Sequence, residues 1–327
     1  MDNVKTWKCF PTSIHEVKMD MSKHDQMLML SYVETGVKDD TLHTLSYFRP
    51  LADSIQKVSE KILENGEYEF EKIEMDFAKK IKKKPKYFEK KNWQKSKLKD
   101  EGGGIFFRIK DGLVFDSVGI NFSEVSGRFS KKFKKNIPGA KKNPNYWASG
   151  ISVVAHMKNP KIPALHFNTR FIVTSKSWFG GGMDATPSFD DSKETKFFHN
   201  NIKHTCNKHK MNYEKYKKWC DKYFYLPHRK EKRGIGGIFF DYKKDSWKKD
   251  FNFVQDLGLC FIDSAKKIIE KKINLTWSNK QKNDQLIKRS RYIEFNLLYD
   301  RGTKFGLNTG GNVEAILMSL PPLAKWK

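Results

Sequence analysis

Residues 150–173 read GISVVAHMKNPKIPALHFNTRFIV, and this stretch decides the fold of the chain. The segments at its two ends, 150–157 and 164–173, are rich in β-branched and aromatic residues, which is typical of strands. Only a few residues separate them, which leaves no room for a helix. Two strands that follow one another so closely predict an antiparallel pair.

Similar strand-like runs precede and follow this pair along the chain. They cover 105–110, 113–121, 235–241 and 291–299, and a further run at 313–320 could be a strand or a helix. Longer segments that mix polar and apolar residues predict helices at 51–64, 194–226, 247–272 and 280–288. This order predicts a mainly antiparallel sheet with helices packed on it. Because no Pro- or Ser-rich linker divides residues 102–327, we expect a single domain over residues 1–327.

The alternation within residues 164–171 places three polar side chains on one face of the predicted sheet. His166, Asn168 and Arg170 share that face, and Leu165, Phe167 and Phe171 point to the other face. The same rule puts Ser152 and His156 on one face of the preceding strand. An acid–base group, an amide and a guanidinium would form a wall suited to binding carboxylates. An ordinary solvent-facing side would also be polar, but charged residues would be expected to dominate it.

Carboxylates and glycines gather at three further places. Asp184 directly follows three glycines, Asp300 and Arg301 follow the run at 291–299, and a third glycine-containing place ends at Asn312. Glycines let a backbone approach a flat ligand closely, although a glycine turn closed by an aspartate cap would look similar. Neither a phosphate-binding loop nor a dinucleotide-binding glycine motif is present in the sequence, so a nucleotide cofactor has no support.

The segment KWCDKYFYLPHRKEKRGIGGIFFD, residues 218–241, combines aromatic residues, a His–Arg pair and a cluster of glycines. His228 and Arg229 could handle protons or carboxylates where the glycines allow a close backbone approach. The alternative is a helix that ends at Gly234, followed by a buried strand that begins at Ile235.

Basic residues dominate the charge of the chain. The 327 residues carry a formal net charge of +25, from 63 Lys and Arg against 38 Asp and Glu. Three explanations stay open: lysine-rich coding bias on a solvated surface, attraction of a polyanionic small molecule, and nucleic-acid binding. The lysine-rich residues 79–99 are expected to form a solvated insertion or a frayed helix, without a face that reads bases.

The remaining composition bears on compartment and metal binding. No stretch approaches the ~20 apolar residues of a membrane span, and no targeting segment is visible. The cysteines lie far apart, which indicates reduced thiols, so we expect a cytoplasmic protein. Four histidines without the spacing of a zinc-protease motif could still gather to bind a metal ion, namely His156, His166, His199 and His228.

Five segments together resemble the oxygen-dependent coproporphyrinogen-III oxidase family. They are the segment 218–241 quoted above, GGGIFFRIKDGLVFDSVGINFSEVSG (102–127), GISVVAHMKNPKIPALHFNTRF (150–171), WFGGGMDATP (178–187) and RSRYIEFNLLYDRGTKFGLNTGGNVEAILMSLPPLAKW (289–326). They follow in order over about the last two-thirds of the chain, whereas residues 1–100 match only weakly. The resemblance implies an α+β fold, in which a large, mainly antiparallel sheet of about seven strands is flanked by α-helices on both faces.

The resemblance also implies an activity. Members of this family convert two propionate groups of coproporphyrinogen III to vinyl groups by oxidative decarboxylation, which gives protoporphyrinogen IX in haem biosynthesis. Molecular oxygen is the co-substrate, no organic cofactor is used, and the members act as homodimers through the region matching residues 292–327. Neither nucleic acid nor a membrane span is implied. Members occupy different compartments, so the mitochondrial intermembrane space and the plastid are alternatives to the cytoplasm.

Carried over by position, the resemblance implies roles for individual residues. His166 would be the proton donor, Asp184 would hold the pyrrole N–H groups of the substrate, and Asp300 would be a second catalytic acid. The substrate-binding positions would be Ser152, Asn168, Thr169, Arg170, Arg301, Gly310, Gly311 and Asn312. Some members are described with a divalent metal on the four histidines named above and others without one, so metal dependence stays open.

One departure from the family pattern keeps other functions in view. The family usually has Arg where Asn312 stands, which removes a guanidinium from a substrate position. A catalytically weakened porphyrinogen-binding homologue is therefore an alternative. A basic nucleic-acid-binding protein is a further alternative, and only the net charge favours it.

Overall fold

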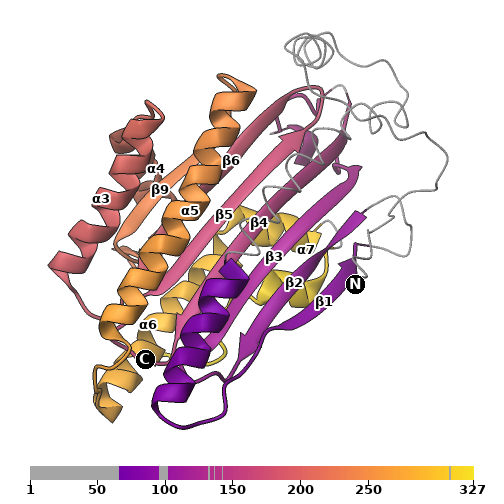
Figure 1. The fold of residues 1–327 in the computed structure, drawn as a ribbon. Coiled ribbons are helices and arrows are strands. Elements are labelled where there is room, and N and C mark those ends of the chain that lie inside the picture. Colours follow the sequence, from indigo (N-terminus) through magenta and orange to yellow (C-terminus); the bar gives the residue numbers. More distant parts are fainter. Residues whose placement is uncertain (1–65, 96–101, 132, 136, 142, 309–310) are drawn as a thin grey trace, which may run out of the picture.

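The fold is built on one seven-stranded antiparallel sheet with the strand order β1-β2-β3-β4-β5-β6-β9 (Figure 1). The structure is a computed structural model that describes residues 66–95, 102–131, 133–135, 137–141, 143–308 and 311–327. The strands of this sheet are β1 (Glu89–Gln94), β2 (Gly102–Lys110), β3 (Phe115–Arg128), β4 (Asn145–Met157), β5 (Ala164–Val173), β6 (Ser177–Thr186) and β9 (Gly236–Lys243). A separate two-stranded ribbon consists of β7 (Tyr225–Leu226) and β8 (Glu231–Lys232). The predicted antiparallel sheet is confirmed.

Helices cover both faces of this sheet, which confirms the α+β prediction. The elements are α3 (Ser192–Lys208), α4 (Tyr213–Tyr223), α5 (Trp247–Lys272), α6 (Asn279–Leu298), α7 (Arg301–Asn308), α8 (Val313–Leu317), the short 3-10 helix η2 (Phe133–Lys135) and a helix over 66–80. In Figure 1, α3, α5 and the helix over 66–80 lie in front of the sheet, and α6 and α7 lie behind it. Within the described ranges, no helix has the length and apolar character needed to cross a membrane.

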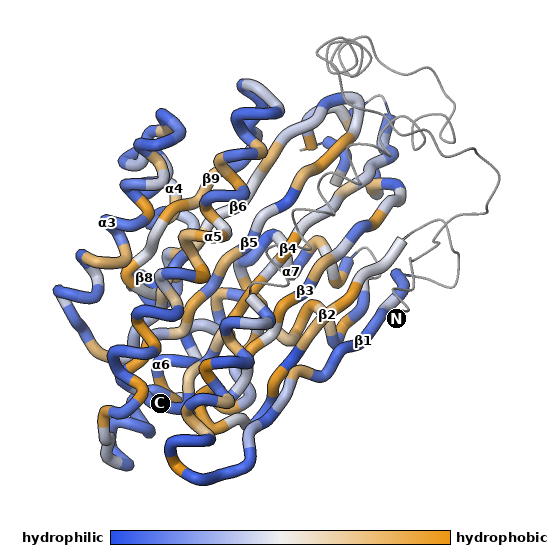
Figure 2. Tube along the Cα trace, viewed as in Figure 1, coloured by the Kyte–Doolittle hydropathy of each residue, from blue (hydrophilic) through white to orange (hydrophobic). Residues whose placement is uncertain are grey.

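Alternation along β5 decides which side chains meet which layer of helices. Leu165 and Phe167 are fully buried, and Phe167 stacks on Phe261 of α5 with ring centroids 5.4 Å apart. His166 and Arg170 are half-buried and point to the opposite face. Figure 2 shows hydrophobic and hydrophilic segments alternating along the strands and along α5. The front face therefore carries the main core, and the rear face of the sheet stays partly polar.

The prediction of a strand over 291–299 is wrong, because residues 291–298 belong to α6 and Tyr299 caps its end. This helix begins after Ser278, whose side chain accepts a hydrogen bond from the Gln281 backbone while the Gln281 side chain accepts one from the Ser278 backbone. Tyr292 and Phe295, three residues apart, are both buried on one side of the helix. Aromatic content favoured a strand, but the helical spacing and the capped start determine the structure. The open choice at 313–320 resolves as α8.

The sequence does not predict two strands of the seven-stranded sheet, nor the β7–β8 ribbon. β6 was read only as a glycine site, and β1 lies inside the lysine-rich residues 79–99, where an insertion or a frayed helix was expected. Glycines usually weaken a strand, but β6 is a central strand whose neighbours β5 and β9 supply hydrogen bonds on both sides. The segment predicted as one helix at 194–226 is divided into α3 and α4, since Asn212 caps the second helix. The helix predicted at 51–64 lies outside the described residues.

Candidate active site on the rear face of the sheet

The strand register brings five of the predicted site residues onto the rear face of the sheet. Ser152 of β4 lies opposite Asn168 of β5, and His166 of β5 lies opposite Asp184 of β6. Arg170 lies opposite Gly180 and Gly150, so no side chain stands beside it on either neighbouring strand. The expectation that residues 164–171 present polar groups to one face is confirmed.

His166 and Asp184 form a hydrogen-bonded pair on this face. The Nδ1–H of His166 donates to Oδ1 of Asp184 at 2.7 Å. The His166 side chain is 22% exposed, whereas that of Asp184 is 3% exposed. A carboxylate that fixes one ring nitrogen leaves the other, Nε2, available to take up or release a proton. Within the part of the chain that the structure describes, no protein group bonds to that Nε2.

A buried guanidinium holds the other oxygen of Asp184. Nη2 of Arg233 donates to Oδ2 of Asp184, and the Arg233 side chain is 1% exposed. Its Cζ lies 4.0 Å, 4.4 Å and 4.9 Å from the ring centroids of Phe224, Tyr292 and Phe295. Burial raises the pKa of Asp184, but the charge of Arg233 and the hydrogen bond from His166 outweigh it and lower the pKa below its usual value. Asp184 is thus an ionised carboxylate with both oxygens bound.

A second carboxylate, Asp241 of β9, joins two arginines of the rear face. It accepts a hydrogen bond from Nη2 of Arg170 at 2.9 Å and one from Nη2 of Arg301, the first residue of α7, at 3.2 Å. The sequence analysis missed Asp241, although it ends the predicted strand 235–241. The guanidinium of Arg301 also lies 5.2 Å from the ring centroid of Tyr223.

Asp300 lies beside this group but is engaged by the protein. Its Oδ1 accepts a hydrogen bond from the Tyr223 hydroxyl at 2.8 Å, and its Oδ2 accepts one from the Thr303 backbone at 2.6 Å. The second bond caps the start of α7. Burial raises the pKa of Tyr223, so this hydroxyl stays a donor at neutral pH.

The remaining predicted residues are placed less favourably. Thr169 is buried on the front face of the sheet, so the structure does not bring it to the other candidates. Asn312 caps α8, because its Oδ1 accepts a hydrogen bond from the Ala315 backbone at 2.9 Å. The Gly311 backbone donates to the Gly306 carbonyl at 2.9 Å, and Gly310 lies outside the described residues.

The four histidines considered as metal ligands have separate partners. His156 is fully buried and its Nε2–H donates to the Ser319 carbonyl at 3.0 Å, and burial lowers its pKa to about 3. His199 bonds to the Ile235 carbonyl and to the Tyr213 hydroxyl. Over the described ranges, no group of three or more His, Cys, Asp and Glu residues could hold a metal ion. These residues therefore do not fit one shared ion.

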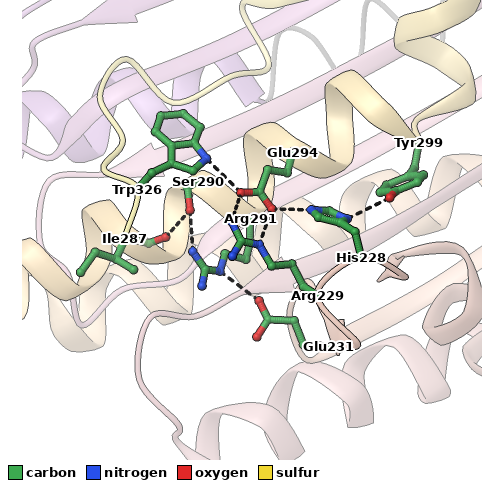
Figure 3. Close-up of polar contacts among 9 residues, drawn as sticks. All are labelled: His228, Arg229, Glu231, Ile287, Ser290, Arg291, Glu294, Tyr299 and Trp326. Carbon is green, nitrogen blue, oxygen red and sulfur yellow. Dashed lines mark hydrogen bonds and ion pairs between the residues drawn. The ribbon is translucent and has the colours of Figure 1, made fainter.

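His228 instead belongs to a polar cluster at the edge of the site (Figure 3). Its Nε2–H donates to Oε2 of Glu294 at 2.8 Å, and its Nδ1 bonds to the Tyr299 hydroxyl at 2.8 Å. Glu294 also accepts two hydrogen bonds from Arg229, at 2.9 and 2.6 Å, and one from the indole N–H of Trp326 at 2.9 Å. The bonds from Arg229 are the main reason that the pKa of Glu294 is lowered to about 2. This Glu294 cluster ties the β7–β8 ribbon and the last residues of the chain to α6.

Comparison with known proteins finds a family model and several relatives that match most of the chain. The family model for coproporphyrinogen III oxidase matches residues 65–327. A relative from Rickettsia bellii (strain RML369-C), named oxygen-dependent coproporphyrinogen-III oxidase, is 53% identical over 260 residues, which are 79% of this chain and 92% of the relative. Relatives of the same name from Rickettsia akari (strain Hartford) and Rickettsia africae (strain ESF-5) are 52% and 50% identical. The match to the Rickettsia akari relative covers 79% of this chain and 92% of the relative. The match to the Rickettsia africae relative covers 86% of this chain and 97% of the relative.

Proposed function

The chain belongs to the coproporphyrinogen III oxidase family, and we propose that the rear face of its sheet is where the reaction takes place. The activity is the oxygen-dependent oxidative decarboxylation of two propionate groups of coproporphyrinogen III to vinyl groups, in haem biosynthesis. One observation supports the placement above all. A half-exposed histidine with a fixed tautomer and two arginines with spare donors share one face.

The arginines suit the charged groups of the substrate. Coproporphyrinogen III carries propionates, and a guanidinium binds a carboxylate through paired, charge-assisted hydrogen bonds. Arg170 and Arg301 each give Asp241 a single hydrogen bond, so further N–H groups of both can bind a propionate. Ser152 and Asn168 lie beside Arg170 and offer polar contacts for the rest of the ring.

His166 is the proposed proton donor. Asp184 fixes its Nδ1–H, so the proton that the imidazolium form of His166 gives up is the one at Nε2, on the open side of the ring. In this proposal Asp184 acts through His166. Each oxygen of Asp184 already accepts one hydrogen bond, so the predicted contact with the pyrrole N–H groups of the substrate uses their remaining lone pairs. Asp300 places α7, and with it Arg301, over the face. Dioxygen is the proposed electron acceptor, and no organic cofactor is assigned.

The assembly and location of the protein are further proposals. Large apolar side chains that are exposed together indicate a protein–protein interface, which supports a homodimer through residues 292–327. Those exposed in this region are Leu297, Leu298, Leu307, Val313, Leu323 and Trp326. Cys206, Cys220 and Cys260 are free thiols, which supports a reducing compartment such as the cytoplasm.

Replacing His166 tests the proposed function. The purified protein is mixed anaerobically with coproporphyrinogen III, oxygen is admitted, and the products are separated by chromatography. Turnover by the unaltered protein is expected, and His166→Asn should lower kcat by about 10²–10⁴-fold because the proton donor is lost. Asparagine keeps an N–H group that can still bond to Asp184, so the fold should be retained.

A second histidine of the chain provides the matched control. Nε2 of His209 bonds to Oδ2 of Asp256 at 2.7 Å, in the helical layer on the front of the sheet. His209→Asn therefore removes a similar histidine–aspartate pair and should leave kcat unchanged. Full activity in His166→Asn would exclude His166 as the proton donor. Absence of the vinyl product from the unaltered protein would instead indicate a weakened homologue.

A further inference from the structure

Asp241 connects the two arginines that the proposed function assigns to the carboxylates of the substrate. Its side chain is 5% exposed, whereas those of Arg170 and Arg301 are 29% and 50% exposed. Both guanidiniums donate to the same oxygen, Oδ2. On the basis of the proposed function, we infer that Asp241 is a positioning residue that holds Arg170 and Arg301 as one clamp for the propionates of the porphyrinogen.

The clamp is formed by three separate elements of the fold. Arg170 comes from β5, Asp241 from β9, and Arg301 from the start of α7. Two guanidiniums brought this close repel each other, and a carboxylate that both share offsets that repulsion. The group keeps a net positive charge, which favours the binding of a further carboxylate from the substrate.

A bulge in β9 lies at Asp241, which the alternation along β9 already places on the rear face with Gly237 and Phe239. Phe179 of β6 pairs with Lys243 and Gly181 pairs with Phe240, so two residues of β9, Asp241 and Tyr242, stand opposite the single residue between them on β6. Tyr242 adopts a φ of 56°, in the left-handed region that a tyrosine rarely occupies. That conformation is strained for a residue with a Cβ atom. Bulges are common beside active sites.

Gly180 of β6 lies opposite the bulge, and because it has no side chain, Arg170 and Asp241 can contact each other across β6. β6 runs between β5 and β9, so the hydrogen bond from Arg170 to Asp241 has to cross it. A Cβ atom on Gly180 would lie 2.6 Å from Oδ1 of Asp241 and 3.0 Å from Cζ of Arg170. An alanine at this position would therefore push the pair apart without changing any charge.

Asp241→Asn tests the inference by separating affinity from turnover. The variant keeps both positive charges, so its affinity for coproporphyrin III, an oxidised tetracarboxylate that does not react, should stay within about threefold of the unaltered protein. Its kcat should fall by ~10–100-fold, because the propionate is no longer held in the reacting position. Fluorescence titration measures the affinity, and initial rates in air measure kcat. An unchanged kcat, or an affinity that falls as far as kcat does, would overturn the inference.

Gly180→Ala is the second variant, and it should give the same separation although it removes no charged group. Asp245→Asn is the control, because Asp245 is an exposed carboxylate of the same region that pairs with Lys243 and should not affect kcat. Thermal unfolding confirms that each variant is folded. Normal kcat in Gly180→Ala would also count against the clamp. Normal turnover in both Asp241→Asn and Gly180→Ala would overturn the role of Asp241 but leave the proposed function standing. Absence of turnover by the unaltered protein would overturn both the proposed function and this inference.

Discussion

Arg233 is a buried charge that holds Asp184, and Asp184 in turn orients His166, the proposed proton donor. Three aromatic rings surround the guanidinium, and its ion pair with Asp184 lies in the same apolar region. Burying two charges is costly, and the pair offsets that cost only while both partners are present. The remaining oxygen of Asp184 then fixes the ring of His166. The chain thus devotes a buried ion pair to the orientation of one imidazole.

We predict that Arg233→Gln lowers the free energy of unfolding by about 3–5 kcal/mol, because Asp184 is left as an uncompensated buried charge. Urea unfolding of the single variant, of Asp184→Asn and of the double variant measures this. The double variant should lose much less than the sum of the two single losses, since it carries neither charge. Additive losses would show that the two side chains are not coupled.

Nothing near Asp184 in the sequence indicates this partner, because Arg233 is 49 positions away and reaches Asp184 only once β6 and β9 are paired. His166 and Arg170, in contrast, could be predicted from alternation alone. A strand with one covered face repeats every second residue, and that period is visible in the sequence. The sequence did not indicate the capping role of Asn312 for a related reason. Its role as a helix cap depends on where α8 begins.

Glu294 links three elements that the sequence leaves unconnected: the β7–β8 ribbon, α6 and the end of the chain (Figure 3). The sequence analysis treated α6 beyond residue 290 as a strand, so no such cluster could be foreseen. Aromatic residues were weighted above their helical spacing. β6 was missed for a different reason, because its glycines resemble a loop although its neighbours β5 and β9 hold it as a strand inside the sheet.

We predict that Glu294→Gln lowers the free energy of unfolding by about 1–3 kcal/mol at neutral pH, because charge-assisted hydrogen bonds are lost. The pKa of Glu294 is lowered from 4.5 to about 2, so its stabilisation is complete above the ordinary value and is lost as the pH falls toward 2. Urea unfolding at several pH values should show the difference between the variant and the unaltered protein shrinking over that range.

Glu231→Gln is the matched control for this measurement. Glu231 is a neighbouring carboxylate that accepts one hydrogen bond, from Nε of Arg291 at 3.1 Å. Glu231→Gln should lower the free energy of unfolding by less than Glu294→Gln does, because Glu294 accepts several hydrogen bonds. An equal loss in both variants, or a difference for Glu294→Gln that does not depend on pH, would contradict the prediction.

The net charge of +25 acts over the molecule rather than at one position. A polyanionic substrate is attracted by such a field before it makes any contact, and dissolved salt screens the attraction. We predict that kcat/KM for coproporphyrinogen III falls by about an order of magnitude between ~10 mM and ~1 M salt, while kcat changes little. Steady-state rates over a salt series check this, with sucrose as an uncharged control. A kcat/KM that does not depend on salt would mean that the lysines only solvate the surface.

The two faces of β5 impose a limit on the length of this strand. Leu165 and Phe167 fill the core, whereas His166 and Arg170 lie on the rear face, where we propose that the reaction takes place. One residue inserted into β5 without a bulge would move every following side chain of the strand to the other face of the sheet. Polar and charged side chains would then be buried in the core, and apolar side chains would line the rear face, where we propose that the substrate binds. During evolution such a strand can exchange its residues one at a time, but it cannot change their number, so variation in length is confined to the connections around it.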